Sequence, residues 1–434
     1  MSDKPDIGIV GLGYVGLTLA VTLADLGFRV WGYERQLEVV EKLKKGQSHI
    51  FEPGVNEVLQ AQLGHGLFID TTLPDRFSGI TIICVSTPIA SEKNPDLRNL
   101  CEATEQVTEA ITDGSLVIVR STVPVGTCRK ILLPLLRAKH KEVRLAFCPE
   151  RTIQGQALRE LRELPQVVGA LDMTSAQLAA KLWEQVTRRV VLISSLEAGE
   201  MVKLINNSHT DLLYSFGNEV AMMAQGFSLD PTELIRTANV GYPRPDLARP
   251  GFVGGPCMSK DPYLLLASLD GSGYVPRLTG AARSINEELP LLVGRHLLDV
   301  LKRFVGNMDS AKVLICGFAY KGWPPTDDMR GSPVVPIVNA LRQYPLRLYG
   351  HDFLVPSETI EACGVIPETD VTKGFKDARA VLFVNEHPSY SELEILGLVQ
   401  RMTHPAVIYD CWRMFDARSF ESEAGIHYAG IGYG

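Results

Sequence analysis

Three features are scarce in this sequence of 434 residues, and each scarcity excludes a class of protein. The eight cysteines form no C-x-x-C pair and no Cys/His cluster at metal-ligand spacing, so neither a disulfide scaffold nor a metal site is expected. Apolar runs span about five to seven residues, well below the roughly 20 that a transmembrane helix needs. The formal net charge of −7 and the lack of a basic stripe argue against a nucleic-acid-binding protein.

The remaining composition is that of an ordinary globular protein, with 45% hydrophobic and 21% charged residues. At roughly 150 residues per domain, the length predicts two or three domains. The first residues contain no basic stretch followed by an apolar segment, so no secretory signal is expected, and no polybasic membrane anchor is visible. We therefore expect a cytoplasmic protein with mostly buried thiols.

Short apolar runs alternate with longer amphipathic segments along most of the chain. The runs at 6–11, 28–34, 80–87, 116–122, 142–150 and 189–194 are predicted strands, and 18–27 is a predicted helix closed by Gly27. Such alternation is typical of a doubly wound parallel sheet with helices on both faces. The predicted fold class is therefore α/β.

Helical patterns dominate the middle of the sequence. Residues 197–226 contain no proline and carry apolar residues at helical spacing, which predicts one long helix, and a second helical block is expected at 276–305. Predicted strands resume at 311–322, 346–352, 378–387 and 406–412. We expect three parts: a Rossmann-like domain at 1–197, a helical region at 198–307, and a second α/β domain at 308–434.

A glycine-rich turn follows the first predicted strand and opens the first helix. Gly11, Gly13 and Gly16 form G-x-G-x-x-G, in which the glycines permit a tight turn, the approach of a pyrophosphate, and close packing of the helix. Glu34 ends the next strand, where a carboxylate can accept hydrogen bonds from a ribose diol and would repel a 2′-phosphate. The motif predicts NAD rather than NADP, although the neighbouring Arg35 could tolerate the phosphate.

Three further loops follow predicted strands: VSTP at 85–88, STVPVGT at 121–127 and CPER at 148–151. Loops at the carboxyl ends of parallel strands line the ligand crevice, and small hydroxyl residues there suit the close passage of a cofactor. Their serines and threonines could instead only cap the loops. Glu150 could act as a base or orient a water, or it could be a solvated loop acid.

The segment 241–265 holds the strongest candidate for a nucleophile. Gly254, Gly255 and Pro256 lead into Cys257, which is expected at the N-terminus of a helix beside Lys260, and both effects lower a thiol pKa. Asp261 lies one turn further on, and Pro262 is acceptable only in the first turn. The alternative is a buried, inert thiol, which is the expectation for the other seven cysteines.

On the long predicted helix, Lys203 and Asn207 are four residues apart and share a face. A lysine on a helix is usually a solvated surface group. Here the two polar residues lie beside an otherwise apolar segment, which favours a role in a site.

Together these motifs resemble the UDP-glucose/GDP-mannose dehydrogenase family, also called the UDP-sugar 6-dehydrogenases. The resemblance covers essentially the whole chain and includes GLGYVGL, VSTP, STVPVGT, CPER, E-x-x-K-L-x-x-N at 200–207, GGPCMSKDP, and GFAYKG followed by TDDMRGSP. It implies an NAD domain, a central dimerising helix and a UDP-binding domain. The implied reaction oxidises the C6 alcohol of a UDP-sugar to a carboxylate with two NAD reduced, without a metal, and its product would feed the synthesis of a polysaccharide or a glycosylated metabolite.

The resemblance also implies roles for individual residues. Cys257 would add to the aldehyde as a thiohemiacetal, which a second oxidation converts to a thioester. Lys203 and Asn207 would stabilise the developing oxyanion. The other implied catalytic residues are Asp261 and Thr122, which would position a water and assist proton transfer, and Glu150, which would assist thioester hydrolysis.

The implied ligand contacts form two sets. Cofactor contacts are implied for Gly11, Gly13, Tyr14, Val15, Gly16, Glu34, Arg35, Ser86, Thr87, Ser121, Thr122 and Arg330. Substrate contacts are implied for Glu150, Arg151, Lys203, Asn207, Arg244, Gly254, Lys260 and Lys321, with Arg244 reaching the substrate across a subunit boundary as one possibility. Arg283 is a further candidate anion partner, and each of these arginines could instead have a surface or ion-pair role.

The sequence leaves the sugar open. PER-x-x-x-G-x-x-L-x-E-L, YPR, ARSIN and TDDMRGSP are closer to the branch that acts on UDP-N-acetylhexosamines, which we favour. That branch usually has GGHC, whereas Pro256 precedes Cys257 here, and Lys260 before Asp261 matches the UDP-glucose branch. UDP-glucose is the alternative. More distant rivals are a two-electron 3-hydroxyacid-type dehydrogenase, which has no role for Cys257, and an inactive nucleotide-sugar binder.

Overall fold

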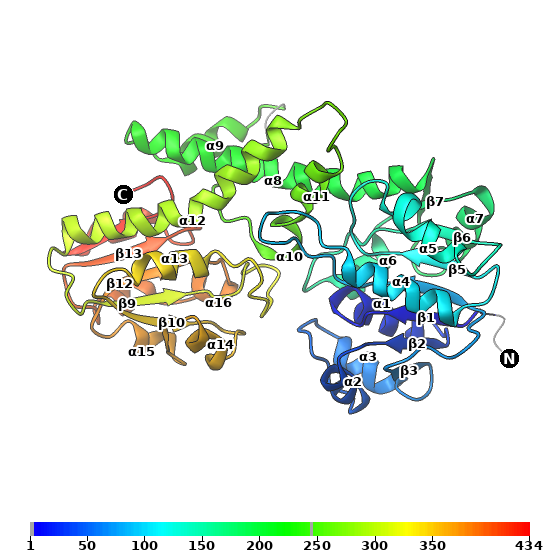
Figure 1. The fold of residues 1–434 in the computed structure, drawn as a ribbon. Coiled ribbons are helices and arrows are strands. Elements are labelled where there is room, and N and C mark those ends of the chain that lie inside the picture. The colour runs from blue at the N-terminus through cyan, green and yellow to red at the C-terminus, as the bar shows by residue number, and fades with distance from the viewer. Residues whose placement is uncertain (1–3, 244–245) are drawn as a thin grey trace. The chain divides into compact units, whose positions relative to one another are not determined.

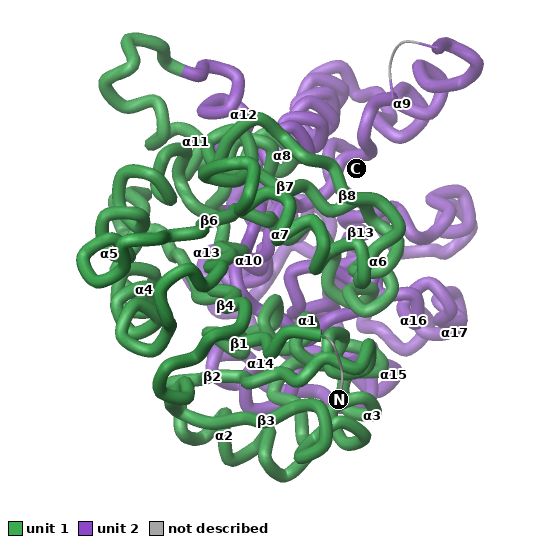
Figure 2. Tube along the Cα trace, turned by 90° about the vertical axis from the view of Figure 1, so that its right-hand side faces the viewer, with its two compact units in different colours: residues 1–207, 260–275 green, residues 208–259, 276–434 purple. Residues whose placement is uncertain are grey.

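The computed structural model describes residues 4–243 and 246–434. The chain forms two compact units, one of Met1–Asn207 with Lys260–Val275 and one of Ser208–Ser259 with Pro276–Gly434 (Figure 2). Among the described residues, no helix has the length and apolar character that a bilayer crossing requires. The three-part division expected above remains a prediction.

The first unit is built on an eight-stranded sheet in the order β3-β2-β1-β4-β5-β6-β7-β8 (Figure 1). Its strands are β1 (Ile7–Val10), β2 (Val30–Tyr33), β3 (Leu67–Asp70), β4 (Ile80–Ile83), β5 (Leu116–Val119), β6 (Arg144–Phe147), β7 (Gln166–Ala170) and β8 (Val190–Ile193). Neighbours pair in parallel except β6 and β7, which are antiparallel. All four residues of β1 are buried, as expected for a strand covered on both faces.

Helices connect these strands. They are α1 (Tyr14–Asp25), α2 (Leu37–Lys44), α3 (Val55–Gln62), α4 (Arg98–Ala110), α5 (Leu133–Arg137), which continues a π-helical turn at Cys128–Leu132, α6 (Ala157–Glu163), α7 (Met173–Trp183) and, from the later part of the chain, α11 (Asp261–Ala267). The N-terminal face of α1 and the loops after β4, β5 and β6 lie at the carboxyl edge of the sheet, where ligands bind in such folds.

The second unit contains a six-stranded parallel sheet in the order β11-β10-β9-β12-β13-β14. The strands are β9 (Lys312–Cys316), β10 (Arg347–His351), β11 (Ile366–Pro367), β12 (Ala378–Phe383), β13 (Ala406–Asp410) and β14 (Ile426–Ala429). Its helices are α9 (Pro231–Asn239), α10 (Gly255–Met258), α12 (Arg277–Phe304), α13 (Val334–Leu341), α14 (Ser357–Ala362), α15 (Val371–Gly374), α16 (Pro388–Ser391) and α17 (Ile395–Val399). The predicted α/β class with two Rossmann-like sheets and a long helix is confirmed.

The long helix α8 (Leu196–Gly226) has 31 residues and matches the prediction of one helix at 197–226. Gly217 lies inside it, where a glycine costs about 1 kcal/mol relative to alanine. Its reason is a close approach, because a Cβ there would lie 2.2 Å from the carbonyl oxygen of Ala248. Five large apolar side chains on α8 remain exposed: Met201, Ile205, Leu213, Phe216 and Met223.

Candidate active site

The turn between β1 and α1 has the geometry that a dinucleotide pyrophosphate needs. Gly11 adopts a φ of 89°, which favours glycine, and a Cβ on Gly16 would lie 1.8 Å from the Gly11 carbonyl oxygen. A Cβ on Gly13, by contrast, would meet no atom within 4 Å. This open space at the N-terminus of a 12-residue helix fits a bound diphosphate.

Glu34 lies at the end of β2 and faces the same turn. One oxygen accepts the Leu12 N–H at 3.0 Å, and the other accepts the Gln36 N–H at 3.1 Å. Each carboxylate oxygen can accept two hydrogen bonds, so acceptor positions remain for a ribose diol. Arg35 donates to Asn99 at 3.0 Å and pairs with Glu102 at 3.4 Å, which directs its guanidinium toward α4.

A buried carboxylate that sequence reasoning missed joins this turn to the loop after β6. Glu52 accepts the hydroxyl of Tyr14, the Gly155 N–H at 2.6 Å and the Ala157 N–H at 2.7 Å. Burial, followed by the hydrogen bond to Glu52, raises the pKa of Tyr14 far above its usual value, so the phenol stays protonated. No local signal separated Glu52 from an ordinary loop acid in the sequence.

The structure brings the VSTP and STVPVGT loops together. The hydroxyl of Thr87 donates to the Thr122 carbonyl at 2.6 Å, and that of Ser121 donates to the Val85 carbonyl at 2.6 Å. Both side chains are buried, whereas Thr122 is half-buried and Ser86 is exposed, accepting from Asn99 at 3.2 Å. The buried hydroxyls therefore tie the two loops to each other.

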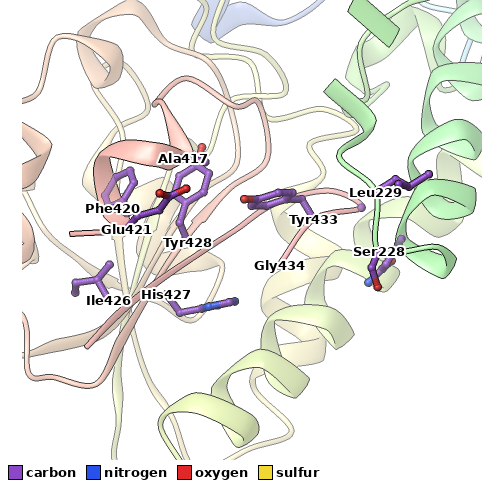
Figure 3. Close-up of a pocket in the computed structure, with 12 residues that line it drawn as sticks. Ser228, Leu229, Ala417, Phe420, Glu421, Ile426, His427, Tyr428, Tyr433 and Gly434 are labelled. Atoms are coloured by element: carbon purple, nitrogen blue, oxygen red, sulfur yellow. The ribbon is translucent and has the colours of Figure 1, made fainter. Parts of the chain in front are cut away.

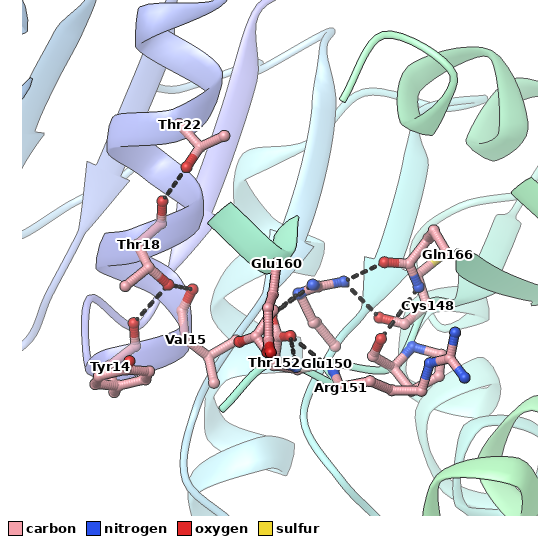
Figure 4. A network of polar contacts seen from close by, with 12 residues as sticks. Tyr14, Val15, Thr18, Thr22, Cys148, Glu150, Arg151, Thr152, Glu160 and Gln166 are labelled. Atoms are coloured by element: carbon pink, nitrogen blue, oxygen red, sulfur yellow. Dashed lines mark hydrogen bonds and ion pairs between the residues drawn. The ribbon is translucent and has the colours of Figure 1, made fainter. Parts of the chain in front are cut away.

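Glu150 lies in a buried polar network rather than in solvent (Figure 4). One oxygen accepts Nε and Nη2 of Arg120 at 3.0 and 2.5 Å, and the other accepts the Arg151 and Thr152 N–H groups at 2.7 Å each. Burial acts to raise the pKa of Glu150, but Arg120, the Thr152 N–H and Lys203 together hold this pKa below its usual value. Glu150 is therefore an ionised carboxylate whose acceptor positions are filled by donors.

Arg120 was not predicted from the sequence. Its side chain is 1% exposed, its Nη1 donates to the Cys148 carbonyl at 3.1 Å and to Gln166 at 2.9 Å, and its guanidinium stacks over the Trp183 ring. The side chain of Arg151, an implied substrate contact, donates to the Pro165 carbonyl. The buried Arg120 guanidinium thus fixes the CPER loop through its bonds to Glu150 and to the Cys148 carbonyl.

The predicted Lys203–Asn207 pair lies near the start of α11. Asn207 donates to Oδ2 of Asp261 at 2.5 Å, and Lys260 donates to Oδ1 of the same carboxylate at 2.8 Å. Asp261 is fully buried and Lys203 is 7% exposed, which excludes the alternative of a solvated surface lysine. The first unit therefore brings together Lys203, Asn207, Lys260, Asp261 and, through its charge, Glu150.

Cys257 occupies the short helix α10 rather than the N-terminus of the following helix, so this detail of the prediction is wrong. The helix breaks after Met258 and resumes as α11 at Asp261, with Pro262 in its first turn as expected. The break has a physical cause, because Pro262 has no N–H to donate to the carbonyl of residue 258 and would clash with it in a continuous helix. The Cys257 side chain is exposed, whereas five of the other seven cysteines are buried.

The loop after β9 packs on α10 within the second unit. A Cβ on Gly254 would lie 2.4 Å from the Gly331 carbonyl oxygen, and one on Gly255 would lie 2.6 Å from the Tyr320 ring. Arg330 donates to Asp328 at 2.6 and 2.9 Å, and Cys257 is among the groups whose charge acts on its pKa. Lys321 lies in the same loop, close enough to Glu386 for its charge to lower the pKa of that carboxyl.

Two arginine predictions have different outcomes. Arg244 lies outside the described residues. Arg283 is 2% exposed and is bonded to Asp211 and to the Met258 carbonyl, so it serves in a buried ion pair, which is the alternative to a substrate anion partner. Its place on α12, three residues before the buried Asn286, gives a polar pair that faces the protein interior.

A pocket in the second unit lies apart from these groups in the sequence. It is lined by Gln225 and Ser228 at the end of α8 and by Phe420, His427, Tyr428 and Tyr433 near the C-terminus (Figure 3). Among the described residues, none of those predicted for the site lines it. The pocket therefore adds nothing to the candidate active site.

Comparison with known proteins decides the family. Family models of the UDP-glucose/GDP-mannose dehydrogenases match at residues 5–187 (NAD binding domain), 197–288 (central domain) and 314–417 (UDP binding domain). The chain belongs to this family. The predicted resemblance is confirmed, as are the prediction of an NAD-dependent dehydrogenase and that of NAD as cofactor.

Individual relatives cover nearly the whole chain. A UDP-N-acetyl-D-mannosamine dehydrogenase of Pyrococcus horikoshii is 32% identical over 437 residues, with 99% of each chain covered. A solved structure of UDP-D-ManNAc dehydrogenase from Pyrococcus horikoshii matches with a TM-score of 0.87, covering 98% of this chain and 99% of the other. A UDP-glucose dehydrogenase from Pyrobaculum islandicum matches with a TM-score of 0.85 at 26% identity, covering 100% and 99%.

Proposed function

We propose that this dehydrogenase oxidises the C6 hydroxyl of a UDP-N-acetylhexosamine to the carboxylate in two successive steps. The main support for this proposal is that Lys203 and Asp261 are buried and that Asn207 donates to Asp261. Further support comes from Cys257, which is exposed and lies four residues before Asp261 in the chain. A single alcohol oxidation has no use for a nucleophilic thiol. A second oxidation needs one, because an aldehyde bound as a thiohemiacetal can lose hydride from carbon.

NAD, when bound, accepts one hydride in each oxidation. In the first step the C6 hydroxyl gives its proton to a water positioned by Asp261 and Thr122, and the C6–H bond breaks with both of its electrons leaving as hydride, which gives the aldehyde. The Cys257 thiolate then forms a C–S bond to the aldehyde carbon, and the carbonyl oxygen becomes an oxyanion that Lys203 and Asn207 stabilise. Loss of the second hydride leaves a thioester, and attack by water breaks the C–S bond and releases the carboxylate and the thiol.

The remaining residues support these steps. Asp261 accepts from Asn207 and Lys260 and thereby orients both donors, and Thr122 assists in positioning the water. Glu150 has no vacant acceptor position in its network, so its contribution to hydrolysis is a fixed negative charge beside Lys203.

The relatives and the motifs support this choice of sugar. The relative at 32% identity is named for UDP-N-acetyl-D-mannosamine, whereas the UDP-glucose dehydrogenase structure is 26% identical. The Arg151 position and the ARSIN segment favour the same branch. UDP-glucose is the second candidate, because the C-x-x-K-D sequence at Cys257 matches enzymes acting on that sugar.

The test is to count NADH per sugar with purified protein and a panel of UDP-N-acetylmannosamine, UDP-N-acetylglucosamine, UDP-N-acetylgalactosamine and UDP-glucose. We expect two NADH per molecule for one of the N-acetylhexosamines. Cys257→Ser should stop at the aldehyde and give one NADH per sugar when the aldehyde is trapped by a hydrazine. Full single-step activity that is indifferent to this substitution would favour the two-electron rival.

We also propose a homodimer formed through α8. Met201, Ile205, Leu213, Phe216 and Met223 fall within about 120° of one another on the helix at 100° per residue, so they form a single exposed apolar stripe. A second copy of the same stripe is a self-complementary surface. Ile205→Glu with Phe216→Glu should convert the dimer to a monomer in sedimentation analysis, while Gln177→Glu on the exposed surface of α7 should not.

A further inference from the structure

The segment that carries Cys257 is held at both ends by hydrogen bonds from two helices of the second unit. At the upstream end, the Gly251 N–H donates to Oδ1 of Asn218 at 2.8 Å, and Nδ2 of Asn218 donates to the Gly251 carbonyl at 2.9 Å. At the downstream end, Nη1 of Arg283 donates to the Met258 carbonyl at 3.0 Å. Residues 252–257 lie between these two anchors.

The downstream anchor, Arg283, replaces a backbone hydrogen bond that the sequence makes impossible. In a continuous helix the Met258 carbonyl would accept the N–H of residue 262, but that residue is proline and has none. The other end of α10 is closed locally, since Ser259 donates its hydroxyl to the Gly255 carbonyl at 2.7 Å. Arg283 therefore supplies the donor that Pro262 lacks, at the C-terminal end of α10 where a cation is favourable.

The two anchors belong to one buried network. Nη1 of Arg283 also donates to Asp211 at 2.6 Å, Asn286 donates to the same carboxylate at 2.8 Å, and Asn218 donates to Asn286 at 2.9 Å. All four side chains are at most 2% exposed. Asp211 and Asn218 lie on α8, and Arg283 and Asn286 lie on α12, so the anchors are attached to the two longest helices of the chain.

We propose that Arg283 and Asn218 are positioning residues that hold the Cys257 thiol in place for the second oxidation. This inference rests on the proposed function, since only the thiohemiacetal and thioester steps use the thiol. The first oxidation needs the substrate and the cofactor but no bond to sulfur. Loosening the segment 251–258 should therefore slow the second oxidation far more than the first.

The experiment compares four variants with the wild-type enzyme. Arg283→Met removes the downstream anchor, Arg283→Lys keeps a cation that can donate, and Asn218→Ala removes the upstream anchor. Tyr409→Phe is the matched control, because it deletes a buried hydroxyl that bonds to His296 of α12 at 2.9 Å without touching the segment. Thermal unfolding and NAD binding establish which variants are folded, and Asn218→Ala serves as the test if Arg283→Met does not fold.

Two readouts decide the outcome. We expect Arg283→Met and Asn218→Ala to slow the second oxidation by about a hundredfold, the scale of a 1 Å misplacement, and to release trappable aldehyde with NADH per sugar falling from two toward one. Arg283→Lys should recover part of this loss, and Tyr409→Phe should keep two NADH per sugar. An equal loss of both oxidations, or unchanged stoichiometry in folded variants, would overturn the positioning role.

Amide hydrogen exchange across residues 251–258 separates this inference from the proposed function. If the wild-type enzyme makes only one NADH per sugar, the four-electron proposal fails by itself. The anchoring is then judged by exchange: faster exchange in Arg283→Met and Asn218→Ala, but not in Tyr409→Phe, supports it. Unchanged exchange in both anchor variants overturns it, whatever the stoichiometry.

Discussion

The two sheets of the molecule begin in the same way and then differ at their first loop. In both, the first six strands follow the order 3-2-1-4-5-6, and a glycine with positive φ follows the first strand: Gly11 at 89° and Gly317 at 95°. In both, a carboxylate at the end of the second strand accepts backbone N–H groups from that loop, Glu34 in the first sheet and Asp352 in the second.

The two sheets differ in the length of this loop and in the number of vacant hydrogen-bond acceptor positions on the carboxylate. The helix after Gly11 begins at Tyr14, whereas the helix after Gly317 begins only at Val334. Glu34 accepts one backbone N–H on each oxygen, while Asp352 accepts four, from Phe318, Ala319, Leu354 and Val355. In the first unit this topology therefore places a helix N-terminus next to a carboxylate with vacant acceptor positions. In the second unit it gives a long loop and a carboxylate whose acceptor positions are filled by backbone N–H groups.

The largest expected effect concerns the short turn. Gly16→Ala should destabilise the protein by about 3 kcal/mol, because its Cβ would overlap the Gly11 carbonyl oxygen and the core cannot absorb it. Gly13→Ala is the matched control, since a Cβ there meets no atom. It should leave stability within about 1 kcal/mol and lower NAD affinity about tenfold or more, because the methyl occupies the space for the pyrophosphate.

Urea unfolding and NAD titration by fluorescence measure the two quantities. A Gly13→Ala protein that binds NAD as well as the wild type would show that the open space at this turn does not hold the diphosphate. The contrast between the two sheets would then lose its functional meaning.

The second prediction exchanges the two carboxylates for amides. Asp352→Asn should cost about 2 kcal/mol of stability, because charge-assisted bonds to backbone N–H groups are lost, and should leave NAD affinity unchanged. Glu34→Gln should cost less than about 1 kcal/mol and weaken NAD binding about tenfold. The same two measurements apply, and equal effects of the two substitutions on both quantities would remove the distinction between them.

The smallest effect is a difference in pH dependence between two acids near strand ends, Glu150 after β6 and Asp410 as the last residue of β13. Burial acts to raise the pKa of Glu150, but Arg120 outweighs it and the pKa is lowered. Glu150 therefore contributes its full stabilisation of the folded protein above about pH 4.5, and this contribution is lost as the pH falls through the lowered pKa. Burial raises the pKa of Asp410 above 3.8, so lowering the pH through that raised value increases stability.

Unfolding free energies measured against pH for the wild type, Glu150→Gln and Asp410→Asn test this contrast. Each unit of pKa shift corresponds to about 1.4 kcal/mol. On acidification the wild type should lose its advantage over Glu150→Gln and gain relative to Asp410→Asn. If acidification changed the stability difference from the wild type in the same direction for both variants, it would contradict the interpretation of Glu150 as an anion paired with Arg120.

Much of the fold could be predicted because buried parallel strands leave a simple pattern. The runs at 6–11, 80–87 and 116–122 became β1, β4 and β5, and the proline-free stretch became α8. Short edge elements such as β3 and β11 were not anticipated, nor were β7 and its antiparallel pairing with β6. Their pairing depends on tertiary contacts, since a half-exposed strand of four residues has too little periodicity to be recognised.

The residues of the candidate site likewise fall into those with a local sequence signal and those without one. Glycine turns and the Lys203–Asn207 spacing are local signals, and the structure places them as expected. Arg120, Glu52 and Asp211 gave no local signal, because their partners lie 30, about 103 and 72 residues away in the sequence. The sequence left Arg283 open between an anion partner and an ion pair for the same reason: its sequence position shows a cation, but only the fold shows that its charge is neutralised in the interior.

The length of α8 is a further constraint on how this protein can change. Lys203 and Asn207 lie in the first half of the helix, and Asn207 donates to Asp261, while Asp211 and Asn218 belong to the network that fixes Gly251 and Met258. Inserting one residue between Asn207 and Asp211 would rotate everything after it by about 100° relative to everything before it. Substitutions along α8 alter single contacts, but an insertion would put two groups of polar residues out of phase at once. We therefore expect this stretch to accept changes of side chain far more readily than changes of length.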